Sequence, residues 1–499
     1  MPEHITPGGN AAIEIDRNAS TPLYRQLYNR LRTQILSGQL EAGTRLSSTR
    51  SLAAELGVSR TTTALVYEQL QLEGYVESRV GDGTRVARLG SERRHQGPGS
   101  AEGRAVRPPQ LAQRAQLLMR TPFPEASYAY QTSAGTNRFR VGEPDVTHFP
   151  YEAWARMLAR QARGSLRAVS YYQAVKGHPA LREAIAAHIG VTRGVRCVPD
   201  QIIITYGAQG ALDLAARVLL DPGDLAWIED PGWGGGRGAV LAAGARPVAV
   251  PVDREGIDVE AGRRRCNHAR LAIVTPSHQF PTAVTMSLAR RLALLEWARQ
   301  VGAWIVEDDY DSEYRFSGRP LEALQGLDDA SRVIYVGTLS KVLFPSLRLG
   351  YLVAPPALVD GFLTARRFMD LGSPLLEQMA MAEFFAEGYF ARHVRRMRAE
   401  YLERRDVLVD ALRRELNDTL EVAVPEAGMH LVAWLSPDVD GDAASRAAAA
   451  HGLHVEPVSR FSARRPARDG LVLGFARDSP EQLLAGVQAV AIALRSLPA

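Results

Sequence analysis

Residues 20–87 carry apolar residues at helical spacing in three successive runs. Gly38 would end the first helix, and the pair Ser47-Ser48 would cap the second. Gly57 would end the second helix and Ser59 would cap the third. The buried faces are expected at Leu23, Leu27, Leu31 and Ile35, then at Leu52, Ala53 and Leu56, and last at Leu65, Val66 and Leu70. The pattern predicts a small domain of three helices.

A hairpin pattern follows the third helix. Residues 75–80 and 84–86 have the composition of strands, and the turn Gly81-Asp82-Gly83 lies between them. Helix, turn, capped helix and hairpin together predict a winged helix-turn-helix. Its third helix would enter the major groove of DNA, with the expected contacts at Arg50, Ser59, Arg60, Thr61, Thr62 and Gly83. A three-helix protein-interaction module has the same apolar pattern and is the alternative.

The segment from PLYRQL at 22–27 to GTRV at 83–86 resembles the DNA-binding domain of the GntR family. The resemblance implies binding to double-stranded operator DNA through Arg50, Arg60, Thr61, Thr62 and Gly83. Ser47 departs from the family pattern, which usually has proline there. This departure affects the entry to the second helix and leaves the expected contacts in place.

Residues 88–127 have the composition of a linker. Gly, Pro, Gln, Ser and Arg dominate, and helical spacing returns only weakly near residues 111–119. Between residues 88 and 120, seven Arg against two Glu give 7 − 2 = +5, which exceeds the net charge of +4 of the whole chain. A basic tether could add non-specific affinity for DNA. A flexible spacer with no contact to DNA is the alternative.

From residue 128 to 499, strand-like and helix-like segments alternate, which predicts an α/β domain with a mostly parallel sheet. A smaller α/β lobe is expected from about residue 376, where a long arginine-rich helix begins. Residues 333–336 predict a buried strand that delivers Thr338, Ser340 and Lys341 to its end, and residues 347–353 a returning strand that carries Arg348. An amine, hydroxyls and a guanidinium at one sheet edge suit a ligand that is both an aldehyde and a phosphate.

Lysine is rare in this chain. Among 59 Lys plus Arg, only Lys176 and Lys341 are lysines, so the other 57 basic residues are arginines. Arginine is not deprotonated in proteins and cannot form an imine with an aldehyde. Lys176 lies in a polar turn before a helix, where a structural role suffices. Lys341 is therefore the expected amine.

A second strand, near residues 303–306, ends in an acidic cluster at 307–313. Open α/β sheets bind ligands beyond the carboxyl ends of their strands. A carboxylate such as Asp308 can pair there with a protonated pyridine nitrogen. The separation 341 − 308 = 33 residues leaves room for one crossover between neighbouring strands. A solvated acidic turn and a site for a divalent metal are the alternatives.

The Ser-Lys segment, the arginine seven residues after it and the sequence EDDYDSEYR at 307–315 resemble a fold-type I pyridoxal-phosphate domain. More narrowly, they resemble the aminotransferase-like domain of MocR-subfamily regulators in the GntR family. The resemblance implies that Lys341 carries pyridoxal phosphate, that no metal is needed, and that the protein is a head-to-tail homodimer. The other implied cofactor contacts are Asp308, Thr338, Ser340, Arg348, Gly207, Ala208, Gln209, Trp233, Tyr310, His278 and, from across the dimer, Tyr171 or Tyr172.

Three positions depart from an aminotransferase. Phe280 stands where an asparagine would touch the phenolic oxygen of the cofactor, and His278 is a candidate to compensate. Ala283 stands where glycine is usual. Val472 stands in the last strand where an arginine would clamp the substrate carboxylate, and Arg460 is a candidate substitute. These losses favour a transcriptional regulator that senses an amine, an amino acid or pyridoxal phosphate itself over the alternative, a working aminotransferase with an accessory DNA-binding domain.

Length and composition agree with this interpretation. A chain of 499 residues predicts two or three domains, and its 46% hydrophobic and 23% charged residues are typical of globular proteins. Neither a secretory signal nor a membrane-spanning run is expected. Cys197 and Cys266, the only cysteines, suggest neither a disulfide framework nor a zinc site. We therefore expect a cytoplasmic protein.

Overall fold

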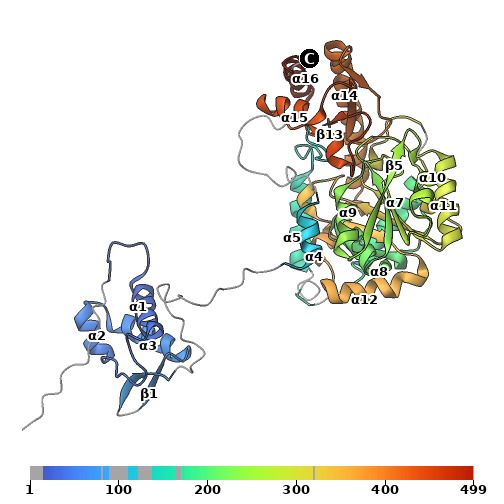
Figure 1. The fold of residues 1–499 in the computed structure, drawn as a ribbon. Helices are drawn as coiled ribbons and strands as arrows, with labels where there is room; N and C mark the ends of the chain where they lie inside the picture. The colour runs from blue at the N-terminus through green and yellow to red at the C-terminus, as the bar shows by residue number, and fades with distance from the viewer. Residues whose placement is uncertain are drawn as a thin grey trace, which may run out of the picture. The chain divides into compact units, whose positions relative to one another are not determined.

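The computed structural model describes residues 15–79, 82–88, 111–121, 138–164, 170–171, 174–318 and 321–497. The chain divides into two compact units, Met1–Gln110 and Leu111–Ala499 (Figure 1). Among these described ranges, no helix is long and apolar enough to cross a membrane.

The first unit contains a winged helix-turn-helix, as predicted. Its elements are α1 (Leu23–Ser37), α2 (Thr49–Leu56), α3 (Arg60–Leu72), β1 (Val76–Arg79) and β2 (Gly83–Val86). The hydroxyl of Ser48 accepts a hydrogen bond from the amide of Ser51 at the start of α2, and the hydroxyl of Ser59 accepts one from the amide of Thr62 at the start of α3. The two strands pair in antiparallel register, Val76 opposite Val86. Helix caps and hairpin are therefore confirmed.

The buried face of α3 differs from the prediction at one position. Leu65 is 53% exposed, whereas Thr63 and Tyr67 are buried with Val66 and Leu70. The hydroxyl of Thr63 donates to the carbonyl of Thr49 at 2.8 Å, so a polar residue closes the contact between α2 and α3. The spacing alone favoured the apolar Leu65, which the tertiary packing turns toward solvent.

The second unit is built on an eight-stranded sheet in the order β3-β10-β9-β8-β7-β4-β5-β6. The strands are β3 (Ile202–Thr205), β4 (Leu225–Asp230), β5 (Arg246–Asp253), β6 (Gly256–Ile257), β7 (Leu271–Val274), β8 (Trp304–Asp309), β9 (Val333–Thr338) and β10 (Gly350–Val353). Strands β9, β8, β7, β4 and β5 run parallel, while β10 is antiparallel to both of its neighbours. The predicted mostly parallel sheet is confirmed, with two reversed strands, β10 and the short edge strand β6.

Helices cover both faces of this sheet (Figure 1). Strand residues such as Ile228 and Ile334 pack with α8 (Gly207–Leu219), α9 (Gly234–Ala242) and α12 (Val359–Met369). On the opposite face, Trp227 of β4 and Ile305 of β8 pack with α10 (Val259–Cys266) and α11 (Leu288–Val301). The remaining helices are α5 (Tyr151–Gly164), α7 (Pro179–Arg193) and α13 (Leu375–Ala386). A sheet buried on both faces leaves its strand ends for ligand contact.

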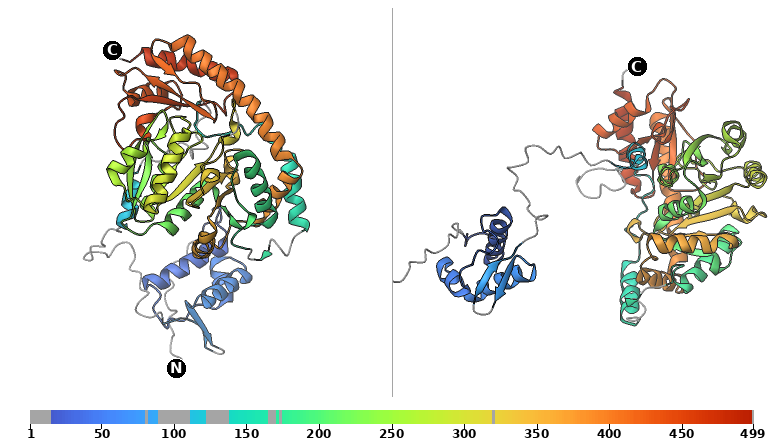
Figure 2. Two further views of the ribbon diagram at one scale, coloured as in Figure 1. Left: turned by 90° about the vertical axis from the view of Figure 1, so that its right-hand side faces the viewer. Right: turned by 60° about the horizontal axis from the view of Figure 1, so that its bottom comes forward.

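The smaller lobe has a four-stranded antiparallel sheet in the order β11-β12-β14-β13. Its strands are β11 (Leu420–Val422), β12 (His430–Leu435), β13 (Glu456–Pro457) and β14 (Gly470–Gly474), with α15 (Gly441–Ala450) and α16 (Pro480–Arg495). The predicted long arginine-rich helix is α14 (Tyr389–Leu416). It packs against both α16 and the short turn of residues 312–314 in the larger domain, and Figure 2 shows it running along the unit's edge. The α14 helix therefore ties lobe and domain together.

The stretch at residues 111–121 contains the helix α4 (Gln113–Met119), which lies against α9. Leu118 is the contact: its Cδ2 atom is 3.8 Å from the position that a Cβ atom on Gly238 would take. This stretch was predicted as part of a linker over 88–127. The rest of that predicted linker, apart from residue 88, lies outside the described residues.

Candidate functional site

A pocket in the second unit collects side chains from the ends of several strands. Asp308 comes from the end of β8, Thr338 from the end of β9, and Ser340 and Lys341 from the turn after it. The other predicted cofactor contacts that line the pocket are Ala208, Gln209, Trp233, Tyr310 and Arg348. Because neighbouring parallel strands end at the same sheet edge, segments more than a hundred residues apart meet here.

Lys341 is half-buried and lines this pocket. Its Nζ atom donates a hydrogen bond to the carbonyl oxygen of Gly142 at 2.8 Å. Burial lowers the pKa of the amine, although the nearby carboxylate of Glu143 opposes that shift. A lowered pKa increases the neutral, nucleophilic fraction of the amine. The other lysine, Lys176, forms an ion pair with Asp200 at 3.2 Å and does not line the pocket.

Asp308 is buried without a partner for one of its oxygens. Among the described residues, nothing hydrogen-bonds to its Oδ1 atom. Burial raises the pKa of Asp308 to about 7, and the neighbouring carboxylates of Asp309 and Glu229 add to the rise. A carboxylate in this state gains most from a cationic hydrogen-bond donor, such as a protonated ring nitrogen.

An anion cradle lies beside Lys341. Gly207 opens α8 with a φ of 70°, and the position that its Cβ would take lies 3.5 Å from the guanidinium of Arg348. The Oγ atom of Ser340 is buried and has no hydrogen-bond partner among the described residues. A helix N-terminus, a guanidinium and an unpartnered hydroxyl suit a phosphate group. A lysine, an aspartate and a cradle for a phosphate group therefore lie in one pocket, and together they fit pyridoxal phosphate.

Arg348 reaches this cradle from a position that the sequence did not predict. Residues 347–353 were expected to form one strand, but β10 begins only at Gly350, after a short helical turn at Pro345–Leu347. Arg348 itself has a left-handed backbone with a φ of 50°. The turn follows Pro345, which cannot donate a ladder hydrogen bond, so the strand starts late. The Nη2 atom of Arg348 donates to the carbonyl of Tyr206 at 3.1 Å, directly before α8.

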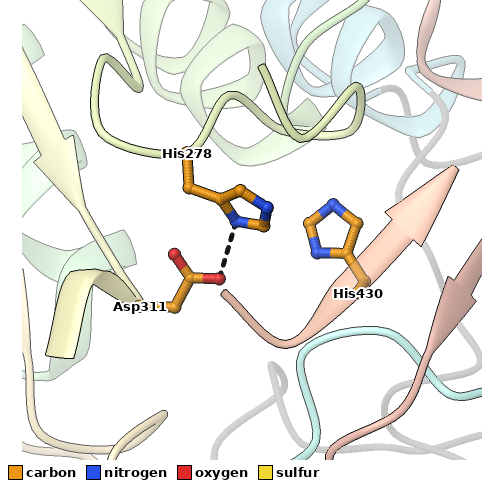
Figure 3. Close-up of side chains that lie close together, drawn as sticks. All are labelled: His278, Asp311 and His430. Atoms are coloured by element: carbon orange, nitrogen blue, oxygen red, sulfur yellow. Dashed lines mark hydrogen bonds and ion pairs between the residues drawn. The ribbon is translucent and has the colours of Figure 1, made fainter. Parts of the chain in front are cut away.

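His278 lies behind the pocket rather than in its wall. Its Nδ1 atom is 2.9 Å from Oδ2 of Asp311 and 3.0 Å from the hydroxyl of Tyr310 (Figure 3 shows the contact with Asp311). When the Nδ1–H donates to these oxygens, the hydroxyl hydrogen of Tyr310 is left to donate into the pocket. The geometry does not support the expectation that His278 contacts the cofactor. It places His278 as a positioning residue that acts through Tyr310.

His278, Asp311 and His430 also form a candidate metal cluster, with potential ligand atoms within 4.8 Å of one another. Each histidine has one ring nitrogen in a hydrogen bond and one that is buried with no hydrogen-bond partner among the described residues, Nε2 of His278 and Nδ1 of His430. Nδ1 of His278 binds Asp311, and Nε2 of His430 lies 3.1 Å from the carbonyl oxygen of Pro281. In Figure 3 the other ring nitrogen of His278 points away from the carboxylate of Asp311, on the side where His430 lies.

One further candidate, Arg460, falls outside the pocket. Arg460 lines a neighbouring depression, and its side chain is 52% exposed and paired with Glu456 at 2.6 Å. The suggestion that Arg460 replaces a carboxylate clamp is therefore not supported by the geometry. Tyr172 lies outside the described residues. Val472, at the expected clamp position, is fully buried in an apolar cluster with Val432 and Val458.

Phe280 and Trp233 form the apolar part of the pocket wall. Their ring centroids are 5.3 Å apart with an interplanar angle of 88°, an edge-to-face contact. Phe280 thus occupies the place of the expected asparagine with a ring that cannot donate a hydrogen bond. Tyr310 remains the hydroxyl donor of this wall. Ala283 has a left-handed backbone with a φ of 62°, which explains why glycine is usual there.

Sequence reasoning missed one side of the pocket. The lining residues that it did not single out include Arg140, Gly142, Glu143, His454 and Glu456. Arg140 to Glu143 come before α5, His454 comes before β13 and Glu456 begins it, so neither segment adjoins in sequence the strand that leads to Lys341. The alternation at residues 453–457 was a usable signal, since Leu453 and Val455 are buried.

The predicted DNA contacts lie on the surface of the first unit. Arg50, Ser59, Arg60, Thr61 and Gly83 are exposed and Thr62 is half-buried. The hydroxyls of Ser59 and Thr62 lie 2.8 Å apart within the helix cap, so both have a structural role. The guanidinium of Arg45, which the sequence did not single out, lies 3.1 Å from where a Cβ of Gly83 would stand. It adds a cation to the wing.

Comparisons with known proteins match both units. Residues 23–86 match the family of bacterial regulatory proteins, gntR family, and residues 137–487 match the family aminotransferase class I and II. The probable rhizopine catabolism regulatory protein MocR of Rhizobium meliloti is 43% identical over 97% of this chain and 96% of that protein. The pyridoxine biosynthesis transcriptional regulator PdxR of Corynebacterium glutamicum is 32% identical over 94% of this chain and 96% of that protein.

Solved structures match the second unit. An archaeal alanine:glyoxylate aminotransferase is similar with a TM-score of 0.71 and 29% identity, over 78% of this chain and 98% of the other. The α-aminoadipate aminotransferase LysN of Thermus thermophilus, complexed with N-(5'-phosphopyridoxyl)-L-leucine, has a TM-score of 0.67 and 30% identity, over 75% of this chain and 97% of the other. The chain therefore belongs to the MocR-type transcriptional regulators of the gntR family, in which a DNA-binding winged helix is joined to an aminotransferase-like pyridoxal-phosphate domain.

Proposed function

We propose that the second unit holds pyridoxal phosphate on Lys341 and that occupation of this pocket by an amine, an amino acid or the cofactor itself changes the affinity of the first unit for operator DNA. One observation carries the cofactor assignment. The buried Oδ1 of Asp308 and Oγ of Ser340 lack partners among the described residues and line the same pocket as Lys341. When bound, pyridoxal phosphate supplies an electrophilic aldehyde carbon and a ring that withdraws electrons.

The protein groups have separate roles in this proposal. Lys341 provides the amine, and the carbonyl of Gly142 orients it. The carboxylate of Asp308 keeps a proton on the pyridine nitrogen, and Tyr310 donates to the phenolic oxygen. Ser340 and Arg348 hold the phosphate, together with the backbone at Gly207.

The first unit would present α3 to the major groove. Arg60 and Thr61 are exposed in its first turn, where side chains reach base edges and phosphates. Replacing Arg60 with Ala should weaken operator binding by about 1–3 kcal/mol. Titration of an operator fragment at fixed salt measures this, with Arg30→Ala on α1 as the control for loss of one exposed charge. Equal affinity of Arg60→Ala and wild type, with the unit still folded, would rule out α3 as the reading helix.

A homodimer is part of the proposal. Large apolar side chains lie exposed at the end of α12: Phe368 is 91% exposed and Leu371 is 51% exposed. The adjoining Gly372 accepts a hydrogen bond from the hydroxyl of Tyr206, which ends the strand leading to the phosphate cradle. An exposed apolar patch beside a site is typical of a subunit interface. Sedimentation analysis of wild type and Phe368→Asp would test this, with a monomeric wild type as the contrary result.

We further propose that the protein acts in the cytoplasm, where its DNA target lies.

A working aminotransferase is the second candidate, because the similar solved structures include aminotransferases and the pocket retains a lysine and an aspartate in their expected places. Val472 opposes it, since an apolar side chain cannot bind a substrate carboxylate. Operator affinity and keto-acid production should be measured on one sample, with and without cofactor and a panel of amines. We expect a change in operator affinity of about 1–3 kcal/mol and slow or absent turnover. Rapid turnover with no effect on DNA binding would favour the enzyme.

A further inference from the structure

On the side of the pocket that the smaller lobe forms, a negative side chain lies near the place where a carboxylate-binding site would carry a positive one. Strand β13 pairs with β14 so that Glu456 stands directly opposite Val472. Side chains of directly opposed residues in an antiparallel pair lie on the same face of the sheet. The position expected to carry a positive clamp is therefore apolar, and its cross-strand neighbour is a carboxylate. Glu456 lines the pocket with Lys341, whereas Val472 is covered.

The carboxylate of Glu456 is held in place and kept ionised. Its Oε2 atom accepts from Arg460 at 2.6 Å, and its Oε1 atom lies 3.2 Å from Nε2 of His454. The two contacts fix the orientation of the carboxylate without using all of its acceptor sites, since a carboxylate offers about four lone pairs. The free lone pairs can accept from a ligand.

The positive side chains that line the pocket are already engaged. Lys341 and Arg348 belong to the cofactor end, and Arg140 forms an ion pair with Glu143 at 3.0 Å. Glu143 is bound a second time by Arg477 at 2.8 Å, so its carboxylate bridges the two arginines. Among the described lining residues, each guanidinium or ammonium outside the cofactor end is already paired with a carboxylate.

We infer that the ligand of this pocket is a primary amine without a carboxylate, whose far end carries hydrogen-bond donors that face Glu456. This inference rests on the proposed cofactor at Lys341 and names the class of effector. The near amine would meet the cofactor, and a hydroxyl or a second ammonium would donate to the carboxylate. A carboxylate at the same place would meet a like charge with no partner.

The test uses full-length, cofactor-loaded protein and amines that differ only at the far end. The four-carbon set is 1,4-diaminobutane, 4-aminobutanol, butylamine and 4-aminobutyrate, and the corresponding compounds with three, five and six carbons cover the length of the pocket. Binding is measured by calorimetry and by the visible absorbance of the bound cofactor. We expect the diamine or the amino alcohol of at least one length to bind at least tenfold more tightly than the amino acid of that length. A tighter amino acid at every length, or no binding by any member, would overturn the inference.

Two variants test whether Glu456 is the source of the preference for the diamine. Glu456→Gln keeps the shape of the side chain and removes its charge, and it should reduce the preference for the diamine at least fivefold. Glu421→Gln removes an exposed carboxylate from β11 of the same sheet and should leave the preference unchanged. Equal preferences in wild type and Glu456→Gln would also overturn the inference. The ranking in wild-type protein stands as a test even where a variant fails to fold.

Operator binding in the same samples separates this inference from the proposed function. If the diamine or amino alcohol binds best while operator affinity stays constant, the regulatory proposal fails and the inference on ligand class stands. If operator affinity responds most strongly to the amino acid, the regulatory proposal stands and the inference fails.

Discussion

The two sides of the pocket differ in whether their polar groups have hydrogen-bond partners within the protein. At the cofactor end, Asp308 and Ser340 each have a buried oxygen without a partner among the described residues. At the lobe end, Glu456 and Glu143 each accept from two neighbours. The pKa values of the carboxyl groups follow the same division: burial raises that of Asp308, whereas hydrogen bonds to His454 and Arg460 outweigh burial and lower that of Glu456.

This difference separates a part of the site that needs a resident group from a part that is complete by itself. An unpaired buried polar atom costs free energy until a partner arrives, so the cofactor end gains most from being filled. The lobe end already has fixed charges and can select among ligands without rearranging. The cofactor end therefore sets which chemistry is available, and the lobe end sets which amine is accepted.

The largest expected effect is at the cofactor end. Lys341→Ala should abolish the covalently held cofactor, because no other lysine lines the pocket among the described residues. The visible absorbance after dialysis against cofactor-free buffer measures this. Lys176→Ala is the matched control and should retain wild-type absorbance. An unchanged absorbance in Lys341→Ala would remove the main contrast between the two ends.

Asp308→Asn should weaken cofactor binding by about 2–5 kcal/mol, since it removes one partner of a buried charged hydrogen bond. Titration of the cofactor-free protein with pyridoxal phosphate, followed by calorimetry, gives the dissociation constant. Glu456→Gln should change this constant by less than about 0.5 kcal/mol. Equal losses in both variants would show that the two ends are not independent.

The pH dependence of stability sharpens the comparison in the cofactor-free protein. Because the folded pKa of Asp308 is raised to about 7, the folded state binds more protons than the unfolded state between pH 4 and 7. Its contribution to stability is present at low pH and is lost as pH rises through this window, so lowering the pH from 7.5 to 5 should add about 1–3 kcal/mol. Asp308→Asn should remove the part of the gain that this carboxyl group contributes, whereas Glu229, whose pKa burial also raises to about 7, keeps its own part.

Glu456 should behave in the opposite sense. Its lowered pKa means that it contributes stability above its unfolded pKa and loses it only as pH falls through the lower folded value. Glu456→Gln should therefore leave the gain between pH 7.5 and 5 intact. Denaturant unfolding of Asp308→Asn and Glu456→Gln at the two pH values measures how the free energy of unfolding of each variant changes with pH. A variant Asp308→Asn with the full wild-type gain would contradict the assignment of the gain to this carboxyl group.

The smallest expected effect is that of His278, which acts through Tyr310. His278→Phe should weaken cofactor binding by about 1 kcal/mol, the contribution of one hydrogen bond. It should also shift the pH at which the visible absorbance of the bound cofactor changes, because Tyr310 loses its orientation. Tyr310→Phe is the comparison and should shift the same transition at least as far. An unaltered transition in His278→Phe would leave His278 with a role in packing alone.

Local signals in the sequence determined the winged helix and the centre of the cofactor site. Ser48 and Ser59 cap their helices because the side-chain oxygen and the amide that it binds are only three residues apart. Lys341, Ser340 and Asp308 were found because each follows an apolar strand, and strand ends meet at one edge. These features depend on short stretches of chain, so their residue types and spacing suffice.

The tertiary structure alone decided the other wall of the pocket. Glu456 faces the pocket because β13 pairs with β14 in one register, and a shift of one residue would turn it to the other face. Arg140 and Glu143 arrive from a segment about 200 residues before Lys341, and His278 lies behind Tyr310 because its ring binds Asp311. Contacts between segments so distant depend on packing and register, which no local spacing of residues specifies. The sequence alone therefore determined which chemistry this protein can hold, and the packed structure decided which side chains select its ligand.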